Sequence, residues 1–584
     1  MSRLDPNLRQ STETKHRELA RGLRTLPNLA VRSAFTVFVL YGLLTLALIT
    51  VVEFGYFSAN FALVVGLVFG LLQFIAGPWL MDLSLRWLYN MNWVEAGGLP
   101  EHLRVFVDRV CKDQNMKFPR FAIIEDGAPQ AFTYGHHPNN ARVVISRGTI
   151  NLLLPGELEG VVAHEIGHAR NWDMALMTIV NLVPLVLYYL YRTLGRFGGG
   201  KKDRGPWWAA AGAYVLYIVS QYIVLWFSRT REFYADRLAG RMTKDPNALS
   251  AALIKIAYGL AAQDSVLAAQ AAASEANGDK KAARKEQEQR EIMGTGALGA
   301  LGIFDRKAAV SMVLGSANQF TTSATSALDP ERVKSAMQWD MWNPWARWYE
   351  LHSTHPLVAR RLEYLSDQAA SLGQRPLILF DRKKPESYWD EFAVDLAVLA
   401  APVAGLIAGI GYVAWTWTSD SFQGSLFGFP LALVGLGGLL NAFYSYRRTG
   451  FDRKTVADLL SEVKVSPVRP VCATITGTII GRGVPGLIYS EDFVIRDSTG
   501  ILFLDYKQPF AIWNWVFGLL KAGGYTQKQV RVQGWFRRSP VPYMEILHME
   551  TLDGAGDQRT CYSSYANFAM YALLLVGGVL LLSL

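Results

Sequence analysis

Seven apolar runs, each long enough to cross a lipid bilayer, divide this 584-residue sequence. A helix needs ~17–25 apolar residues to cross ~30 Å of hydrocarbon. The runs are 33–52, 57–80, 174–191, 207–227, 396–417, 426–446 and 565–584. Because backbone in lipid must satisfy its hydrogen bonds internally, these runs predict membrane helices. The polar stretches between them predict aqueous domains, so the expected fold is mostly α and multi-pass.

Composition supports a chain that is partly in the membrane and partly in water. Hydrophobic residues make up 51% and charged residues 18%, whereas soluble domains average about 25% charged residues. The net charge of +9 would raise nucleic acid as a partner, but the basic residues cluster beside apolar runs. A lipid bilayer is therefore the expected partner and nucleic acid is not. Cys111, Cys472 and Cys561 are too far apart to indicate a disulfide framework.

The distribution of lysine and arginine predicts how the chain crosses the cell membrane. Seven basic residues lie within 1–32, so this tail should be cytoplasmic. The loops 53–56 and 418–425 carry no basic residue and should lie outside, which leaves 81–172 inside. The loop after 191 is basic but falls outside in this scheme. Either the 174–227 hairpin crosses fully against that bias, or it inserts only in part.

A short motif beside the third apolar run indicates metal chemistry. His164 and His168 are four residues apart, so both imidazoles face one side of a helix and can bind one ion. Glu165 lies between them, where a general base is needed. This His-Glu-x-x-His arrangement is typical of zinc metallopeptidases. The sequence therefore predicts an active site at a membrane surface, on the cytoplasmic side.

A catalytic zinc site needs a third protein ligand, and Glu232 is the candidate. His168 lies a few residues before the third apolar run, and Glu232 lies a few residues after the fourth. If these two runs form an antiparallel hairpin, His168 and Glu232 come together at the same end. Asp236, four residues further on, shares the helix face of Glu232. We expect Asp236 to accept the free ring N–H of a ligating histidine. The expected cofactor is one zinc ion per chain.

Two further segments of this region have expected structures. Residues 121–126 and 141–150 are expected to be strands. A strand between them is the candidate sheet edge to which an extended substrate adds; it consists of Ala131, Phe132, Thr133, Tyr134 and Gly135. An ordinary internal hairpin strand is the alternative.

The other histidines are not expected to bind metal. His136 and His137 lie in an Asn-Pro turn, which is typically exposed. The same interpretation applies to His16, His102 and His548.

Over roughly residues 30–370 the sequence resembles the HtpX-type membrane zinc peptidases, which are related to the CAAX prenyl endopeptidase. The resemblance rests on 164–168, 232–236, 131–144 and the run 352–357 with Arg361. It implies a zincin-like α+β peptidase domain, protein or peptide substrates, and a role in protein quality control. It also implies that His355 stabilises the oxyanion. The family usually has Asn where Gln130 stands.

The C-terminal third departs from this family layout. Five β-rich runs at 471–480, 491–496, 501–505, 530–536 and 543–549 predict a small OB-like β-barrel. Such a barrel could bind single-stranded nucleic acid or a sugar, or it could recruit a substrate. The candidate nucleic-acid contacts are Arg482, Tyr489, Phe493, Phe503, Arg537 and Arg538. The tryptophan-dense stretch 339–348 favours a core or interfacial belt over a substrate groove.

The expected organisation follows from these segments. After the 1–32 tail and two membrane helices in 33–80, the peptidase domain covers 81–370; within it, 261–290 reads as an exposed helix or linker. A 371–395 linker leads to two membrane helices in 396–446, the barrel in 450–560 and a last membrane helix in 565–584. The expected function is a membrane zinc endopeptidase. Specific processing of a lipidated or membrane substrate and a membrane-tethered binding module are the alternatives, and an oligomer is left open.

Overall fold

The computed structural model describes most of the chain from residue 91 onward. The described ranges are 91–124, 131–197, 207–256, 330–380, 386–419, 423–482, 492–525, 528–539, 542–552 and 556–584, with short stretches between 39 and 87. The predicted 1–32 tail, most of the first two predicted membrane helices and the 261–290 segment lie outside them.

The chain forms two compact units. The first comprises Met1–Leu260, Gly296–Arg306 and Glu350–Phe380. The second comprises Ala261–Thr295, Lys307–Tyr349 and Asp381–Leu584.

A four-stranded sheet forms part of the first unit. Its strands are β1 (Asn92–Val94), β2 (Arg120–Ile124), β3 (Ala131–Gly135) and β4 (Ala141–Ser146), in the order β1-β2-β4-β3. β2 and β4 pair in parallel, and among the described strands β3 pairs only with β4, antiparallel. The segment predicted as a substrate-binding edge is therefore an edge strand.

Helices cover this sheet and extend away from it. They are α4 (Glu101–Asp113), α5 (Arg147–Leu152), α6 (Pro155–Arg170), α7 (Asp173–Phe197), α8 (Trp207–Thr243) and α15 (Val358–Ser371), with 3-10 turns at Ala96–Gly98 and Pro138–Asn140. The predicted strand 141–150 is wrong beyond Ser146. Its hydroxyl accepts a hydrogen bond from the Thr149 N–H at 3.1 Å and caps α5, so the chain turns into a helix there.

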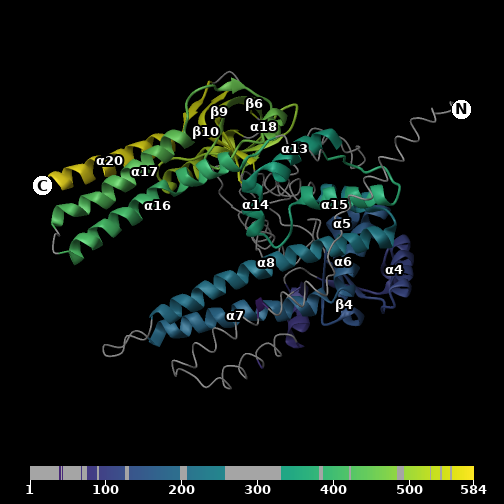
Figure 1. Ribbon diagram of the computed structural model, residues 1–584. Coiled ribbons are helices and arrows are strands. Elements are labelled where there is room, and N and C mark those ends of the chain that lie inside the picture. Colours follow the sequence, from purple (N-terminus) through teal and green to yellow (C-terminus); the bar gives the residue numbers. More distant parts are fainter. Residues whose placement is uncertain are drawn as a thin grey trace. The chain divides into compact units, whose positions relative to one another are not determined.

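α7 and α8 lie side by side as an antiparallel pair (Figure 1). Both are long and apolar enough to cross a membrane. At ~1.5 Å per residue the 37 residues of α8 exceed the ~30 Å of bilayer hydrocarbon. The charged C-terminal part of α8, which starts at Arg229, therefore extends beyond the hydrocarbon.

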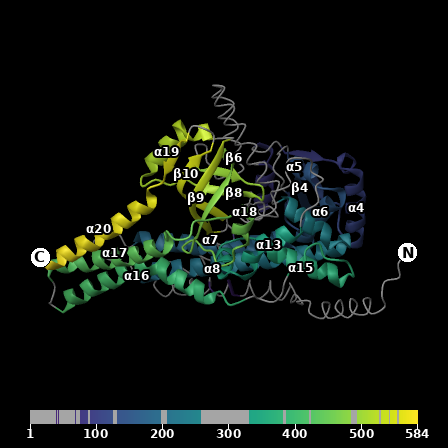
Figure 2. The ribbon, with the colours of Figure 1, turned by 90° about the horizontal axis from the view of Figure 1, so that it is seen from above.

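The second unit contains a bundle of three long apolar helices. These are α16 (Trp389–Thr418), α17 (Gly428–Ser445) and α20 (Ser563–Ser583), which lie together in Figures 1 and 2. Gly435 and Gly578 allow α17 and α20 to approach closely. A Cβ at either position would collide with the backbone of the other helix.

The described residues thus contain five candidate membrane helices, Asp173–Arg192, Trp208–Thr243, Trp389–Thr418, Gly424–Ser445 and Ser563–Ser583. They confirm the last five predicted apolar runs. α16 begins at Trp389, seven residues before the start predicted from its apolar run.

A closed β-barrel completes the second unit and confirms the predicted C-terminal fold. Its strands are β6 (Val471–Arg482), β7 (Phe493–Arg496), β8 (Ile501–Asp505), β9 (Gln529–Arg538) and β10 (Pro542–Thr551). They pair in the ring β6-β7-β8-β10-β9 and back to β6, with β8 and β10 parallel. Short additions are β5 (Asp452–Arg453), β11 (Gln558–Thr560), α18 (Val456–Ser461), α19 (Ala511–Leu520) and 3-10 turns at Gly424–Phe427 and Ala522–Tyr525.

The side chains proposed for nucleic-acid stacking and binding are mostly barrel core. Phe493 and Phe503 are both buried. Arg537 donates to Glu545 Oε2 at 3.0 Å, and Arg538 donates to the Ala336 carbonyl at 2.9 Å, so both cations are committed internally. The Tyr489 residue and the Arg482 side chain lie outside the described part. The buried residues therefore cannot serve as the contacts that the sequence suggested.

The tryptophan-dense stretch is structural. It forms α13 (Pro330–Trp342) and α14 (Pro344–Leu351). Trp339 is buried and its indole N–H donates to the Val465 carbonyl at 2.8 Å. Trp345 donates to Asp395 Oδ2 at 3.1 Å. These satisfied indoles support the core interpretation rather than a substrate groove.

Candidate active site

Two imidazoles of α6 converge on one point. The Nε2 atoms of His164 and His168 lie 3.1 Å apart. The opposite nitrogen of each ring faces a carboxylate: His164 Nδ1 is 2.9 Å from Asp236, and His168 Nδ1 is 2.7 Å from Asp173. A carboxylate accepts the ring N–H, so each histidine in its neutral form carries its proton on Nδ1 and directs the Nε2 lone pair toward the other ring. Two facing lone pairs suit a shared cation.

Glu232 of α8 completes the donor set. Its two carboxylate oxygens lie 3.5 Å from His164 Nε2 and His168 Nε2, respectively. All three potential ligand atoms fall within 4.8 Å of one another. Glu232 Oε2 is buried and accepts no hydrogen bond from the described residues. Two nitrogens, one oxygen and an unsatisfied buried anion fit a catalytic zinc ion, and they confirm the predicted convergence of these residues.

A glycine allows α6 and α8 to approach this closely. A Cβ at Gly167 would lie 3.3 Å from the Cα and the carbonyl oxygen of Ala235. Gly167 precedes His168, and Ala235 is three residues after Glu232. The close contact therefore brings the ligand-bearing turns of the two helices together.

Glu165 lies beside the metal ligands and is almost fully buried. Burial raises the pKa of its carboxyl above the ordinary value, although the imidazoles of His168 and His164 act to lower it. The Glu165 carbonyl accepts a hydrogen bond from Thr133 Oγ1 of β3 at 3.2 Å. This bond connects the metal-binding helix to the edge strand.

His355 and Arg361 approach the centre from the segment around α15. His355 is buried, and its Nδ1 lies 3.2 Å from Glu232 Oε2. Arg361 donates two hydrogen bonds to Asp236, at 2.6 and 2.8 Å, and its Nη1 is 3.5 Å from Glu232 Oε2. This buried guanidinium offsets the charge of the two carboxylates on α8.

The site opens into a cleft of about 560 Å³. Thr133, Tyr134 and Gly135 of β3 line one part, and His355 lines another. The cleft continues along α7 to Asn181 and along α8 to Gln221, which are ~12 and ~16 Å along their helices from Asp173 and Glu232. It therefore reaches from the metal ligands toward the membrane-spanning parts of the hairpin.

Comparison with known proteins supports this arrangement. The model of peptidase family M48 matches residues 100–369, which include every site residue named in this subsection. The chain is 33% identical to "Protease HtpX homolog" of Methanothermobacter thermautotrophicus over 191 residues, 33% of this chain and 70% of the relative. It is 32% identical to "Protease HtpX homolog 2" of Methanosarcina mazei over 233 residues, 38% of this chain and 76% of that one.

The chain belongs to peptidase family M48. This M48 membrane protein is thus a zinc metallopeptidase of the HtpX-like kind. Among solved structures, Ste24p of S. mikatae aligns with 57% of this chain and 64% of its own, at 16% identity and a TM-score of 0.31.

Among the described residues of this M48 peptidase, His136 and His548 lie outside the metal cluster. His136 Nε2 is 3.1 Å from the Ile75 carbonyl, and its Nδ1 is 3.1 Å from the Asn140 side chain. His548 Nδ1 is 2.9 Å from Thr560 Oγ1. The predicted positions His16 and Gln130 fall outside the described residues.

Two residues of the M48 centre, Asp173 and Arg231, were not predicted from the sequence. Asp173 faces His168, whereas Asp236 was the one carboxylate that the sequence predicted as an acceptor for a ligating histidine. Arg231 lies 3.6 Å from Asp173, and its Nη2 donates to Ser228 Oγ at 3.3 Å. A carboxylate next to an apolar run is costly unless it has a partner. The position of Asp173, directly before the run 174–191, could therefore have identified it from the sequence.

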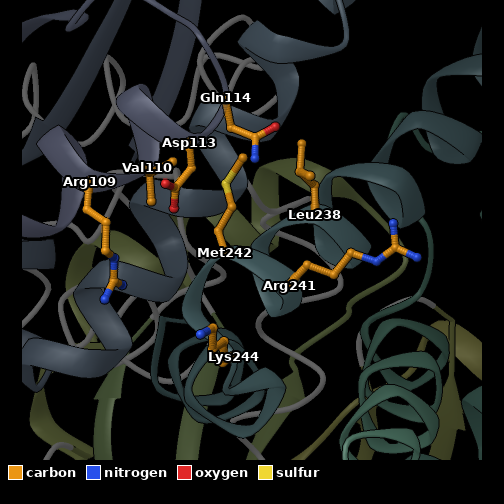
Figure 3. Close-up of a pocket in the computed structure, with 8 residues that line it drawn as sticks. All are labelled: Arg109, Val110, Asp113, Gln114, Leu238, Arg241, Met242 and Lys244. Carbon is orange, nitrogen blue, oxygen red and sulfur yellow. The ribbon is translucent and has the colours of Figure 1, made fainter.

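A second hollow of about 320 Å³ lies between α4 and the end of α8 (Figure 3). Arg109, Arg241 and Lys244 contribute exposed cations to it, and Asp113 lies among them. It shares no lining residue with the M48 cleft. The hollow therefore contributes no group to the peptidase site.

Proposed function

We propose that this M48 metallopeptidase hydrolyses peptide bonds in membrane proteins and in protein segments close to the membrane. The observation that carries the proposal is the cleft, which connects Glu165 and the metal ligands to residues of the helices α7 and α8. A segment emerging from the bilayer can enter such a cleft without leaving the membrane surface. Removal of damaged membrane proteins is the physiological role that we propose.

The edge strand β3 is the proposed substrate-binding element. Its free edge can pair with an extended peptide, because β3 is hydrogen-bonded to β4 on one side only among the described strands. The Thr133 bond to the Glu165 backbone supports this role, since it fixes the strand beside the catalytic turn. Ala131 and Phe132 are buried, so they would act through the backbone.

The proposed chemistry divides between the cofactor and the chain. Zinc held by His164, His168 and Glu232 would polarise the scissile carbonyl and acidify the attacking water. The Glu165 carboxylate takes up the proton of the water and returns it to the leaving amine nitrogen. Asp236 holds His164 in the tautomer that binds metal, and Asp173 does so for His168.

His355 is proposed to stabilise the oxyanion. Its Nε2 is buried and has no hydrogen-bond partner in the part of the chain that the structure describes, and the residue lines the cleft. A hydrogen bond donated from that position to the carbonyl oxygen strengthens as negative charge develops on this oxygen. Its Nδ1 faces Glu232, which would fix the ring in place.

The proposed topology has the N-terminus and the active site facing the cytoplasm. The basic residues flanking the apolar runs support it. One zinc ion per chain is proposed, because the described residues contain one group of three potential ligands within 4.8 Å. We also propose the domain boundaries that the sequence predicts.

Glu165→Gln tests the peptidase assignment. We expect purified, zinc-loaded protein to cleave unfolded casein and the variant to lose at least ~10²-fold in rate, because proton transfer is removed. Glu159→Gln is the matched control, since Glu159 lies on the same helix outside the metal cluster. Unchanged activity of Glu165→Gln at equal zinc content would refute the assignment.

A second arm tests the membrane-proximal substrate. The same unstructured segment is supplied either fused to a single membrane helix in the same bilayer or as a soluble peptide. We expect faster cleavage of the tethered form, with cut sites near the membrane. Equal or faster cleavage of the soluble peptide would contradict the membrane-proximal preference while leaving the peptidase assignment intact.

A further inference from the structure

The helix α19 exposes an apolar surface on the outside of the β-barrel (Figure 2). Its ten residues include no charged residue and one polar side chain, Asn514. The exposed fraction is 64% for Ile512, 54% for Trp513 and 53% for Trp515, and 61% for the preceding Phe510. A surface helix in water normally presents polar residues outward, so this exposed set indicates a contact with something apolar.

The contacts that hold α19 to the barrel do not use this exposed set. Phe517 is buried and stacks on Tyr506, with ring centroids 4.0 Å apart and planes at 17°. Asn514 Oδ1 accepts a hydrogen bond from the Gln508 backbone N–H at 2.7 Å. Attachment to the barrel therefore does not account for Ile512, Trp513 and Trp515.

α19 is tied to the point where a membrane helix begins. Gln508 donates to the Thr560 carbonyl at 2.9 Å and accepts from the Tyr562 N–H at 3.2 Å. α20 starts directly afterwards, at Ser563, and is a candidate span from its first residue. Tyr562 and Tyr565 are exposed there, as is typical of aromatic residues at a membrane interface.

The charges around α19 suit anionic headgroups. Lys507 precedes the helix and Lys521 follows it, and both are exposed. The sequence from 506 to 525 contains no Asp or Glu. Tryptophans flanked by lysines and free of acidic residues are typical of helices that lie in a bilayer interface.

We infer that α19 is an interfacial membrane anchor, which lies in the plane of the bilayer surface on the side where α20 begins. Ile512, Trp513 and Trp515 insert to the boundary between headgroups and acyl chains, ~5–10 Å deep. Lys507 and Lys521 contact lipid phosphates. The barrel is thereby held against the membrane by α19 as well as by α20. Lipid is favoured over a protein partner because the surface is continuous with the start of a membrane helix.

Spin labelling of the full chain tests this inference. Ile512→Cys and, separately, Trp515→Cys are labelled with Cys472 replaced by Ser, because Cys111 and Cys561 are buried. The protein is reconstituted in phosphatidylcholine vesicles that contain phosphatidylglycerol. Casein cleavage by each labelled protein checks that it is folded. We expect both labels to be more accessible to oxygen, which concentrates in lipid, than to a water-soluble nickel chelate.

Ser498→Cys is the matched control. Ser498 is exposed in the turn between β7 and β8, at the opposite end of β8 from α19, and its label should be more accessible to the nickel chelate. Nickel accessibility at 512 and 515 equal to that at 498 would overturn the inference. Dipolar coupling between labels on two chains, with low oxygen accessibility, would also overturn it in favour of self-association.

Discussion

Each metal-binding histidine has a carboxylate of its own, and the two carboxylates differ in their surroundings. Asp173 faces His168 and Arg231, and its side chain is buried. Asp236 faces His164 and takes two hydrogen bonds from Arg361. Each carboxylate therefore faces a buried guanidinium as well as a ligand, but Arg231 lies 3.6 Å from Asp173, whereas Arg361 donates two hydrogen bonds to Asp236.

This difference predicts distinct effects of two matched substitutions. We expect Asp173→Asn and Asp236→Asn each to weaken zinc binding ~10–100-fold, because the ligating ring loses its acceptor. Asp236→Asn should in addition lower the free energy of unfolding by ~3–5 kcal/mol, since Arg361 loses the charged carboxylate that accepts its two hydrogen bonds. Competition with a chromogenic chelator and thermal unfolding measure the two effects. Asp113→Asn, at an exposed carboxylate, is the control, and equal behaviour of all three variants would contradict the assignment.

Protonation of His164 predicts how zinc binding depends on pH. Burial disfavours the imidazolium, but the neighbouring carboxylates of Asp236 and Glu232 outweigh it and raise the pKa of His164 in the metal-free protein to about 9. Below that pH zinc must displace a proton, so the apparent affinity should rise about tenfold per pH unit up to about pH 9. Calorimetry at pH 7 in two buffers of different ionisation enthalpy should show release of about one proton per zinc. Binding without proton release would show that His164 is already neutral.

The residue-scale predictions from sequence succeeded where chemistry fixes the spacing. His164 and His168 must be one helical turn apart to share an ion, and this spacing is visible in the chain. Asp173 was missed because its distance from His168 depends on the turn between α6 and α7. In that turn Trp172 has φ of 60°, a backbone conformation that the sequence did not suggest.

At the scale of elements, the approach of α6 to α8 determines whether Glu232 reaches the histidines. We expect Gly167→Val to push α8 away through the clash with Ala235, destabilise the protein by ~1–3 kcal/mol and reduce zinc affinity. Thermal unfolding and zinc content measure both effects. Gly156→Val on the same helix is the control, because nothing lies within 4 Å of a Cβ at Gly156. Normal zinc content in Gly167→Val would show that the close approach is dispensable.

Elements were predictable where periodicity and length were unambiguous. The barrel strands were found within one to two residues at most ends, because turn residues separate them. α19 was missed: its ten apolar residues are too short for a membrane helix and lack a polar face. The strand predicted at 141–150 ran too far because a local cap at Ser146 competes with strand pairing.

At the scale of the whole molecule, the catalytic side chains gather in one unit. Glu165, Glu232 and His355 all belong to the unit that contains Met1–Leu260 and Glu350–Phe380. The second unit carries the barrel and the bundle of α16, α17 and α20. Zinc binding should therefore stabilise one unit selectively.

Chelation tests that selectivity. Removing zinc should increase hydrogen exchange in α6 and in the charged end of α8, because the ion links these helices. Exchange in the barrel strands β6, β9 and β10 should not change, since none of them carries a ligand. Peptide-resolved exchange with and without a zinc chelator measures both. A matching increase in the barrel would contradict independent stabilisation.

The sequence by itself determined the five membrane helices that the structure describes, the pair of histidines and the strands of the barrel. Each depends on a period or a length that is local in the chain. Only the tertiary structure decided which carboxylates hold His164 and His168, which strand lies at the sheet edge, and that Phe493, Arg537 and Arg538 are buried. These features depend on how distant segments pack, and packing is fixed by close contacts such as that of Gly167 with Ala235, which no local pattern encodes.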